Sequence, residues 1–252
     1  MFEHFKGEEV FVKKVLDYLD QVQYKQRLIL TQFLDPYHQS IVKSVIGHQD
    51  EVQVLENGGF IHSESQRIII APYFYEIKKE DFEIVVCKII YAKNFEKLTH
   101  RDILGALMSL GIKRELFGDI VEKDKGFYLA VDRHIYEYLK DHLSMIKRSK
   151  VKFVEWDEEI EVKNDYLVKS FIVSSFRLDK IISSFYKISR QKAAEFIRAG
   201  HVKVNHKPVE QINYLCNNKD IISFKKHGRV MFVDCNKQTR SDNYVVEGYF
   251  YK

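Results

Sequence analysis

The stretch from Ser189 to Asn205, SRQKAAEFIRAGHVKVN, constrains the fold more than any other part of the chain. Ala193, Phe196 and Ile197 have the spacing of one buried helical face, and the Ser189 hydroxyl can cap this helix by accepting from free amides of its first turn. Gly200 suits the left-handed residue that ends a helix, and the alternation after it predicts a strand. The sequence therefore predicts a short helix that turns directly into a strand.

A second helix is predicted just before this unit. In the sequence FRLDKIISSF, Leu178, Ile181 and Phe185 share one helical face, whereas Arg177 and Lys180 lie on another. A short break separates the two helices. We therefore expect two helices and a strand tied into one compact unit.

Positive charge is concentrated in the same third of the chain. Residues 170–252 contain 15 Lys or Arg and 7 Asp or Glu, whereas the whole chain has 40 and 36. The predicted start of the second helix adds unpaired amides and the positive end of a helix dipole, with Arg190 and Lys192 beside it. A basic unit of this kind points to a polyanion, most commonly nucleic acid, although a merely solvated charged surface remains the alternative.

The chain before residue 170 divides into two further regions. Residues 8–22 have the pattern of an amphipathic helix, Asp35-Pro36 opens a second helix, and GGFIHSESQRIIIAP predicts two short strands around a polar turn. From Glu83 onward the predicted order is strand, helix, strand, strand, helix, strand, with a capping box from Thr99 to Asp102 before the first helix and Asp132 as the cap of the second. That order is typical of a split βαβ, or ferredoxin-like, layer.

Length and composition limit the class of protein. A chain of 252 residues with 45% hydrophobic residues can bury a substantial core in two or three domains. No apolar run approaches the roughly 18 residues of a membrane span, and the start lacks a signal-peptide pattern, so we expect a cytoplasmic protein. Cys87, Cys216 and Cys235 are scattered without a CxxC, which predicts neither a disulfide framework nor a zinc site.

The ordered pattern of the C-terminal third resembles a known RNA-binding module, that of ribosomal small-subunit protein four (the S-four domain). His206 and Lys219 stand where this module usually has glycine. These two departures affect the expected geometry of two turns more than the expected fold. The residues that carry the resemblance are Arg177-Leu178-Asp179, Ser189-Arg190, Ala193, Ile197, Gly200, Val202-Lys203-Val204-Asn205 and Asp220-Ile221-Ile222.

The resemblance extends to the rest of the chain. LTQFLDPYHQ near the start and LTHRDILGALMSLGIKRELFGDI in the middle are similar to the whole-length pattern of the YlmH family of bacterial proteins. That resemblance implies a cytoplasmic RNA-binding protein without catalysis, linked to ribosomes and translation, whose gene often lies near cell-division genes. By analogy, the implied target is rRNA of the large ribosomal subunit, with tRNA as a further candidate, and the implied setting is translation quality control.

An enzymatic interpretation rests on Asp179. The tripeptide Arg-Leu-Asp also surrounds the catalytic aspartate of pseudouridine synthases, but here it begins an amphipathic helix and only 73 residues follow it. The sequence contains no GxGxxG, no phosphate-cradling GxxxxGK followed by Ser or Thr, and no HExxH. We therefore expect neither an enzyme nor a cofactor. The same holds for a metal, because the spacings of His134 with His142, and of Cys216, His227 and Cys235, are not those of a metal site.

We therefore predict an α+β protein with a helical and mixed region at 1–72, a ferredoxin-like (RRM-like) domain at 73–162, an S-four-type module of two helices and a small sheet at 170–235, and a tail at 236–252. The predicted function is docking on structured RNA, with basic residues on phosphates and Tyr186 as a candidate for stacking on a base. The alternative is a protein-interaction adaptor in cell division or septum formation that meets an acidic partner. The sequence specifies neither the RNA nor the oligomeric state.

Two groups of residues are the candidate RNA contacts. A second contact in the middle region, or an ordinary surface, is predicted for His100, Arg101, Lys113 and Arg114. The main contact is predicted for Arg177, Lys180, Tyr186, Ser189, Arg190, Gln191, Lys192, Arg198, Lys203 and Lys207.

Overall fold

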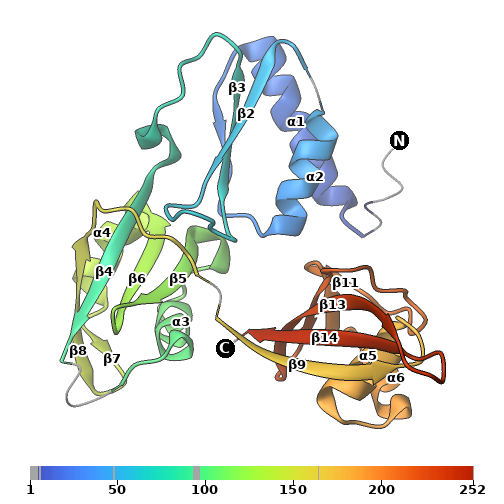
Figure 1. Ribbon diagram of the computed structural model, residues 1–252. Helices are drawn as coiled ribbons and strands as arrows, with labels where there is room; N and C mark the ends of the chain where they lie inside the picture. Colours follow the sequence, from blue (N-terminus) through green and yellow to red (C-terminus); the bar gives the residue numbers. More distant parts are fainter. Residues whose placement is uncertain (1–4, 6, 48, 93–96, 164, 252) are drawn as a thin grey trace. The chain divides into compact units, whose positions relative to one another are not determined.

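The computed structural model describes residues 5, 7–47, 49–92, 97–163 and 165–251. Within these residues the chain forms six α-helices and three antiparallel sheets, which confirms the α+β prediction (Figure 1). It divides into two compact units, Met1–Val162 and Lys163–Lys252. No helix among the described residues is long and apolar enough to cross a membrane.

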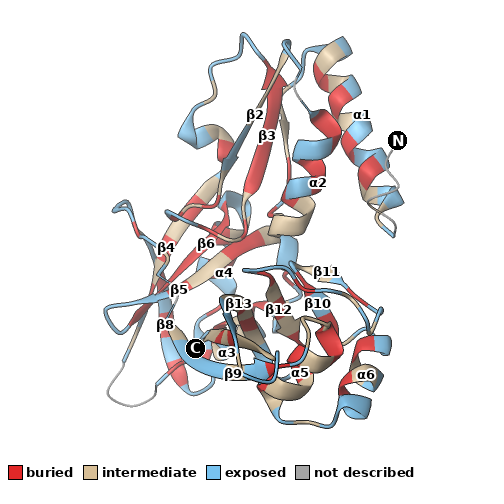
Figure 2. Ribbon diagram, turned by 45° about the vertical axis from the view of Figure 1, so that its right-hand side comes forward, coloured by how far each residue is buried: buried red, intermediate tan, exposed pale blue. Residues whose placement is uncertain are grey.

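The first part of the N-terminal unit packs two helices against a three-stranded sheet of order β1-β3-β2. Its central strand β3 is buried along its whole length, as Figure 2 shows. The predicted cap at Asp35 is confirmed, because its side chain accepts a hydrogen bond from the amide of His38. The elements are α1 (Glu9–Lys25), β1 (Ile29–Leu30), α2 (Pro36–Ile46), β2 (Val52–Asn57), β3 (Arg67–Pro72) and the 3-10 helix η2 (Lys79–Phe82).

One strand prediction in this part is wrong. The start of GGFIHSESQRIIIAP forms a turn, and the strand that pairs with β3 is β2, which precedes the two glycines. The Asn57 side chain accepts from the amide of Gly59 at 2.7 Å, and Gly59 has φ 86°. The chain therefore turns at the two glycines, and the strand expected after them is reduced to an isolated bridge at Ile61.

The second part of the N-terminal unit has the predicted order of strand, helix, strand, strand, helix and strand, with a short extra strand β7 before the last. Its sheet order is β5-β6-β4-β8-β7. The predicted caps are confirmed, since Thr99 forms a capping box with Asp102 and Asp132 accepts from two amides of α4. The elements are β4 (Ile84–Tyr91), α3 (His100–Ser109), the 3-10 helix η3 (Arg114–Leu116), β5 (Phe117–Lys123), β6 (Gly126–Asp132), α4 (Arg133–His142), β7 (Met145–Ile146) and β8 (Ser149–Glu155).

The C-terminal unit packs two helices on one face of a six-stranded sheet of order β11-β10-β12-β13-β14-β9. This sheet is larger than predicted. The stretch expected as a tail contains β14, which pairs with β9 over eight residues because its alternate residues, such as Val246, are buried in the core. The elements are β9 (Tyr166–Val173), α5 (Leu178–Tyr186), α6 (Arg190–Arg198), β10 (Val202–Val204), β11 (Lys207–Pro208), β12 (Ile221–Phe224), β13 (Gly228–Gln238) and β14 (Tyr244–Tyr251).

The two residues that replace glycine in the S-four pattern adopt the backbone conformation that glycine favours. His206 has φ 69° in the turn between β10 and β11, and Lys219 has φ 72° before β12. The Asn205 side chain donates to Asp220 at 2.8 Å and fastens these two turns to each other. Both turns therefore form although His206 and Lys219 replace glycine. The two residues adopt the left-handed backbone conformation, which is unfavourable for a residue with a side chain.

Candidate nucleic-acid interface

The two helices of the C-terminal unit are joined by a buried carboxylate. Asp179, in the first turn of α5, is 2% exposed and accepts from two arginines. Arg177 donates through Nε to Oδ1 at 3.0 Å and through Nη2 to Oδ2 at 3.3 Å. Arg190, the first residue of α6, donates through Nε to Oδ2 at 2.7 Å. We call these three residues the arginine clasp; it fixes the start of α6 against the start of α5.

The electrostatics of the clasp favour an ionised Asp179. Burial alone would raise the pKa of this carboxyl, but the hydrogen bonds and charges of Arg177 and Arg190 outweigh burial and lower the pKa below its ordinary value. Asp179 is therefore a carboxylate near neutral pH. The two arginines keep further N–H groups beyond those used in the clasp, because a guanidinium carries five.

The start of α6 is the capped helix N-terminus that the sequence predicts. Ser189 is the N-cap, and its Oγ accepts from the amide of Lys192 at 3.2 Å. Ala193 and Ile197 are fully buried, as predicted, so the opposite side of the helix faces solvent. The helix begins at Arg190 and brings its remaining first-turn amides to the surface beside Lys192.

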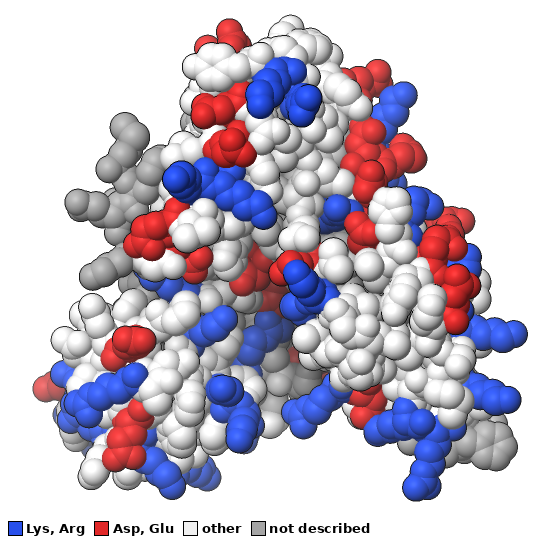
Figure 3. All heavy atoms as spheres, turned by 180° about the vertical axis from the view of Figure 1, so that it is seen from behind, with Lys and Arg blue, Asp and Glu red and all other residues white. Residues whose placement is uncertain are grey.

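Exposed cations continue along the outer side of α6. Lys192 and Arg198 are exposed, and within the described part of the chain their side chains form no hydrogen bond or ion pair. Gln191 is also exposed and donates weakly to Glu195 at 3.3 Å. We call Gln191, Lys192 and Arg198 the α6 face. In the view of Figure 3 the charged side chains on the C-terminal unit are mostly Lys and Arg.

The other predicted contacts are not all brought to this face. Lys180 donates to Ser174 Oγ at 2.9 Å, on the solvent side of α5. Lys203 is exposed between the buried Val202 and Val204, so it points away from the sheet face that the helices cover. Lys207 is half-buried on the edge strand β11. The predicted set is thus divided between the helices and the opposite face of the sheet.

Tyr186 has a different environment from the one predicted. It is the last residue of α5, and its ring packs edge-on against Phe224 at 5.1 Å, His227 at 5.7 Å and Phe250 at 5.9 Å. Its hydroxyl is buried without a hydrogen-bond partner among the described residues, and burial raises its pKa to about 12. Tyr186 therefore packs against the core of this unit with its hydroxyl buried, while part of its ring remains exposed.

Arg114, from the second group of predicted contacts, is held by the protein itself. Its Nη1 donates to the carbonyl of Phe117 at 2.6 Å and its Nη2 to Ser65 Oγ at 3.2 Å. Burial lowers the pKa of Arg114, with partial compensation by Asp119 and other carboxylates. Arg114 therefore connects η3 to the loop before β3, although it is classed as exposed, as are Arg101 and Lys113.

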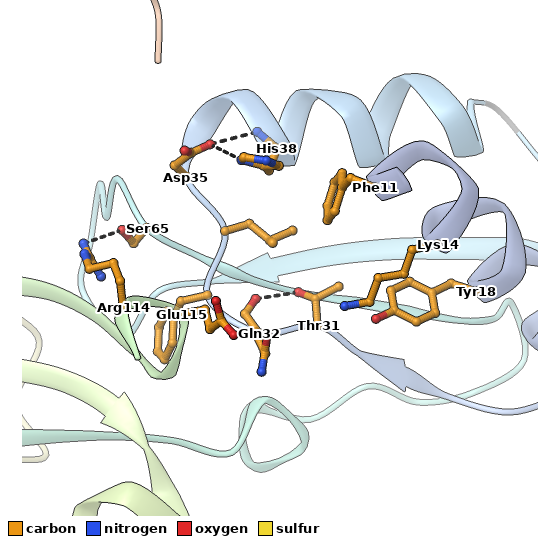
Figure 4. Close-up of a pocket in the computed structure, with 12 residues that line it drawn as sticks. Phe11, Lys14, Tyr18, Thr31, Gln32, Asp35, His38, Ser65, Arg114 and Glu115 are labelled. Carbon is orange, nitrogen blue, oxygen red and sulfur yellow. Dashed lines mark hydrogen bonds and ion pairs between the residues drawn. The ribbon is translucent and has the colours of Figure 1, made fainter. Parts of the chain in front are cut away.

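A cavity of about 450 Å³ lies next to Arg114 (Figure 4). His38 lines it, and its Nδ1 lies 2.8 Å from Asp35 Oδ1; this hydrogen bond raises the pKa of His38 against the effect of burial. The other lining residues are Phe11, Lys14, Tyr18, Thr31, Gln32, Phe33, Leu34, Asp35, Ser65, Arg114 and Glu115.

The sequence pattern does not predict the clasp. It predicts RNA contacts for Arg177 and Arg190, and it places Asp179 at the start of an amphipathic helix. A signal was available, because an acidic residue on a buried helical face requires a cation within reach. The Cys216, His227 and Cys235 trio has separate environments: Cys216 is buried, and His227 stacks on Phe224 at 4.0 Å.

Comparisons with known proteins cover most of the chain. Family models match at residues 7–74 ("YlmH, N-terminal"), 78–159 ("Putative RNA-binding domain in YlmH") and 176–222 ("S4 domain"). The chain is 32% identical over 255 residues to "Ribosome-associated protein quality control protein P2" of Bacillus subtilis (strain 168). The aligned region covers 98% of this chain and 96% of the relative. A solved structure, "Cell division protein ylmH from Streptococcus pneumoniae", is 28% identical with a TM-score of 0.53, covering 62% of this chain and 96% of that one.

Proposed function

The chain belongs to the YlmH family, and from this membership we propose that it is a non-catalytic RNA-binding protein of the cytoplasm that docks on rRNA of the large ribosomal subunit, with tRNA as an additional ligand. The proposed role is in ribosome-associated quality control, which the name of the Bacillus subtilis relative supports. The observation that carries the proposal is the α6 face inside a matched S4 domain: Lys192 is exposed beside the capped N-terminus of the helix, and Arg198 is exposed in its last turn.

The proposed mechanism is electrostatic docking. First-turn amides of α6 and the side chains of Lys192 and Arg198 contact phosphates, while Gln191 supplies a neutral hydrogen-bonding group. The clasp orients Arg177 and Arg190 through Asp179, so that their remaining N–H groups add to the same positive surface. Contacts of this kind position a protein on RNA, and the shape of the RNA then supplies selectivity.

The remaining predicted contacts are kept as parts of this proposal in supporting roles. Ser189 acts as the cap of α6 rather than as a separate anchor, and Lys180 and Lys207 extend the positive surface around the helices. Tyr186 is kept only through the part of its ring that remains exposed, because its hydroxyl is buried. We also propose the three-part division at 1–72, 73–162 and 170–235, with a ferredoxin-like middle domain, supported by the sheet order of β5, β6, β4 and β8 and by the limits of the family matches.

The clasp also supports the non-catalytic part of the proposal. A general base or nucleophile acting on a flipped uridine needs a carboxylate that can reach the base. Both oxygens of Asp179 are occupied by arginine N–H groups, and the side chain is 2% exposed. Asp179 is therefore better suited to hold the two helices together than to perform catalysis.

Co-sedimentation with ribosomes tests the proposal. We expect the wild-type protein to sediment with the large subunit, to be released by RNase, and to lose the association in the Lys192→Glu/Arg198→Glu variant. The matched control is Lys13→Glu/Lys14→Glu, which reverses two exposed lysines on α1. Arg190 is not reversed, because a glutamate there would face the carboxylate of Asp179.

A second candidate is the adaptor in cell division, which the name of the pneumococcal structure favours. In that case the basic surface would meet an acidic protein. Association with ribosomes that persists after RNase, or that is absent from the start while an acidic division protein is retained, would support the adaptor over the RNA-binding function.

A further inference from the structure

The sheet of the C-terminal unit has two different faces. Alternate residues of its strands pack against α5 and α6, among them Val202, Ile222, Val230 and Val246, which are all fully buried. Their sequence neighbours point to the opposite side, because successive side chains of a strand alternate between faces. We call that opposite side the outer face. Neither helix of this unit covers it.

Strand register places two cations and two tyrosines in one row across the outer face. Lys203 on β10 is paired with Ser223 on β12, and Ser223 is paired with Arg229 on β13. The Arg229 guanidinium lies 4.7 Å from the ring centroid of Tyr251 on β14, and Tyr251 is paired with Tyr166 on β9. The row therefore runs from positive charge to aromatic rings over five adjacent strands.

The tyrosines form a cluster with defined geometry. The rings of Tyr166 and Tyr251 are 4.9 Å apart and inclined by 74°, and those of Tyr166 and Tyr249 are 5.7 Å apart and inclined by 79°. The Tyr249 hydroxyl donates to Glu247 at 3.2 Å. All three tyrosines are only partly buried. Edge-to-face packing holds the rings in place while part of their surface remains accessible.

The charge of the outer face indicates which partner fits these rings. Strand pairing assigns Lys203, Arg229 and Lys237 to this face, against Glu247 as the acidic residue. Aromatic rings beside cations are the combination that binds unpaired nucleotides, because rings stack on bases while the cations contact the phosphates. An acidic protein would be attracted by the cations alone, whereas unpaired RNA offers both phosphates for the cations and bases for the rings.

We propose that the outer face is a second RNA-binding surface, on which Tyr166, Tyr249 and Tyr251 stack on unpaired bases and Lys203 and Arg229 contact the adjoining phosphates. It deepens the proposed RNA-binding function and rests on it. The α6 face then takes structured RNA, and the outer face takes a single-stranded segment. Lys203 lies on the side of the sheet opposite the helices and so cannot belong to the α6 face. On the outer face it has a role in RNA binding.

The test measures affinity of the full-length protein for a fluorescein-labelled single-stranded 12-mer of uridine and for a labelled RNA hairpin. In Tyr166→Leu/Tyr251→Leu we expect affinity for the 12-mer to fall about fivefold or more, since stacking on an aromatic ring contributes on that order per base. Tyr166→Phe/Tyr251→Phe should restore it, because phenylalanine retains the ring. Tyr24→Leu, which removes a tyrosine that is 82% exposed on α1, is the matched control.

The outcomes separate this inference from the function on which it rests. Hairpin binding that persists in the Leu variant while 12-mer binding falls supports a second surface. A 12-mer carrying 5-iodouridine should also photocrosslink to Tyr166, Tyr249 or Tyr251, which a merely structural role of these rings would not produce. Equal 12-mer affinities for wild type and Leu variant would overturn the inference alone. A Leu variant that differs from the wild type in sedimentation coefficient but not in RNA affinity would also overturn the inference, and would indicate that the outer face mediates self-association. Failure of the wild-type protein to bind either RNA would overturn the proposed function as well.

Discussion

Arg190 Nε donates to Asp179 Oδ2 at 2.7 Å, and this bond joins the first residue of α6 to the first turn of α5. Arg177 completes the clasp from the residue before α5. The carboxylate is almost fully buried, whereas the side chains of Arg177 and Arg190 are 31% and 55% exposed. The proposed RNA surface is therefore built on an acidic residue that RNA would not contact.

Asp179→Asn should destabilise the C-terminal unit while preserving its shape. The substitution leaves two guanidinium groups without their carboxylate, and a buried pair that loses one partner costs several kcal/mol. Because both arginines are partly solvated, we expect a smaller loss of about 1–3 kcal/mol in the free energy of unfolding. Urea denaturation measures it, and Glu195→Gln, at an exposed site on α6, is the control; equal losses for the two variants would contradict the clasp.

The stabilisation by Asp179 should depend on pH in the acidic range. Its folded-state pKa is lowered below the ordinary value of 3.8, so its contribution is complete above that value and is lost as pH falls through the folded-state pKa. We therefore expect the difference in unfolding free energy between wild type and Asp179→Asn to be constant at neutral pH and to shrink below about pH 4. A difference that grew on acidification would show that the carboxylate is not stabilised by the arginines.

Tyr186→Phe should leave the protein equally stable or stabilise it. The Tyr186 hydroxyl is buried and has no partner among the described residues, and a buried unpaired polar group costs about 1–3 kcal/mol. Phenylalanine keeps the edge-on contacts with Phe224 and Phe250. Thermal unfolding measures the effect, and a clear loss of stability in Tyr186→Phe would contradict an unpaired hydroxyl.

Lys219→Gly should stabilise the turn before β12. Lys219 has φ 72°, where a side chain costs roughly 1–2 kcal/mol, while glycine adds about 0.5–1 kcal/mol of unfolded-state entropy. The expected gain is a few tenths of a kcal/mol to about 1 kcal/mol. Lys225→Gly, at an exposed lysine outside the positive-φ residues, should instead destabilise. A loss of thermal stability in both variants would show that the left-handed backbone at Lys219 carries no strain.

Local chemistry was predictable from the sequence, and non-local pairing was not. The caps at Asp35, Thr99, Asp132 and Ser189 are confirmed because a cap depends on residues within one turn. The turn at Gly200, with φ 68°, follows the same logic.

The misses involve partners far apart in the chain. The strand β14 was expected as a tail because its place in the sheet is set by β9, whose Tyr166 pairs with Tyr251. The division of the basic residues between α6 and the outer face likewise follows from tertiary packing, which turns Lys203 away from the helices. The clasp joins residues 11 positions apart across two helices, and helical periodicity within either one does not report it.

The most direct test of the account is the salt dependence of affinity for a large-subunit rRNA fragment, compared between the wild-type protein and Lys192→Gln/Arg198→Gln. If both side chains contact phosphates, the slope of log affinity against log salt should be less steep in the variant, by about 0.7–0.9 for each lost contact. The thermal unfolding of the variant should stay unchanged. An unchanged slope in a folded variant would contradict RNA docking through the α6 face.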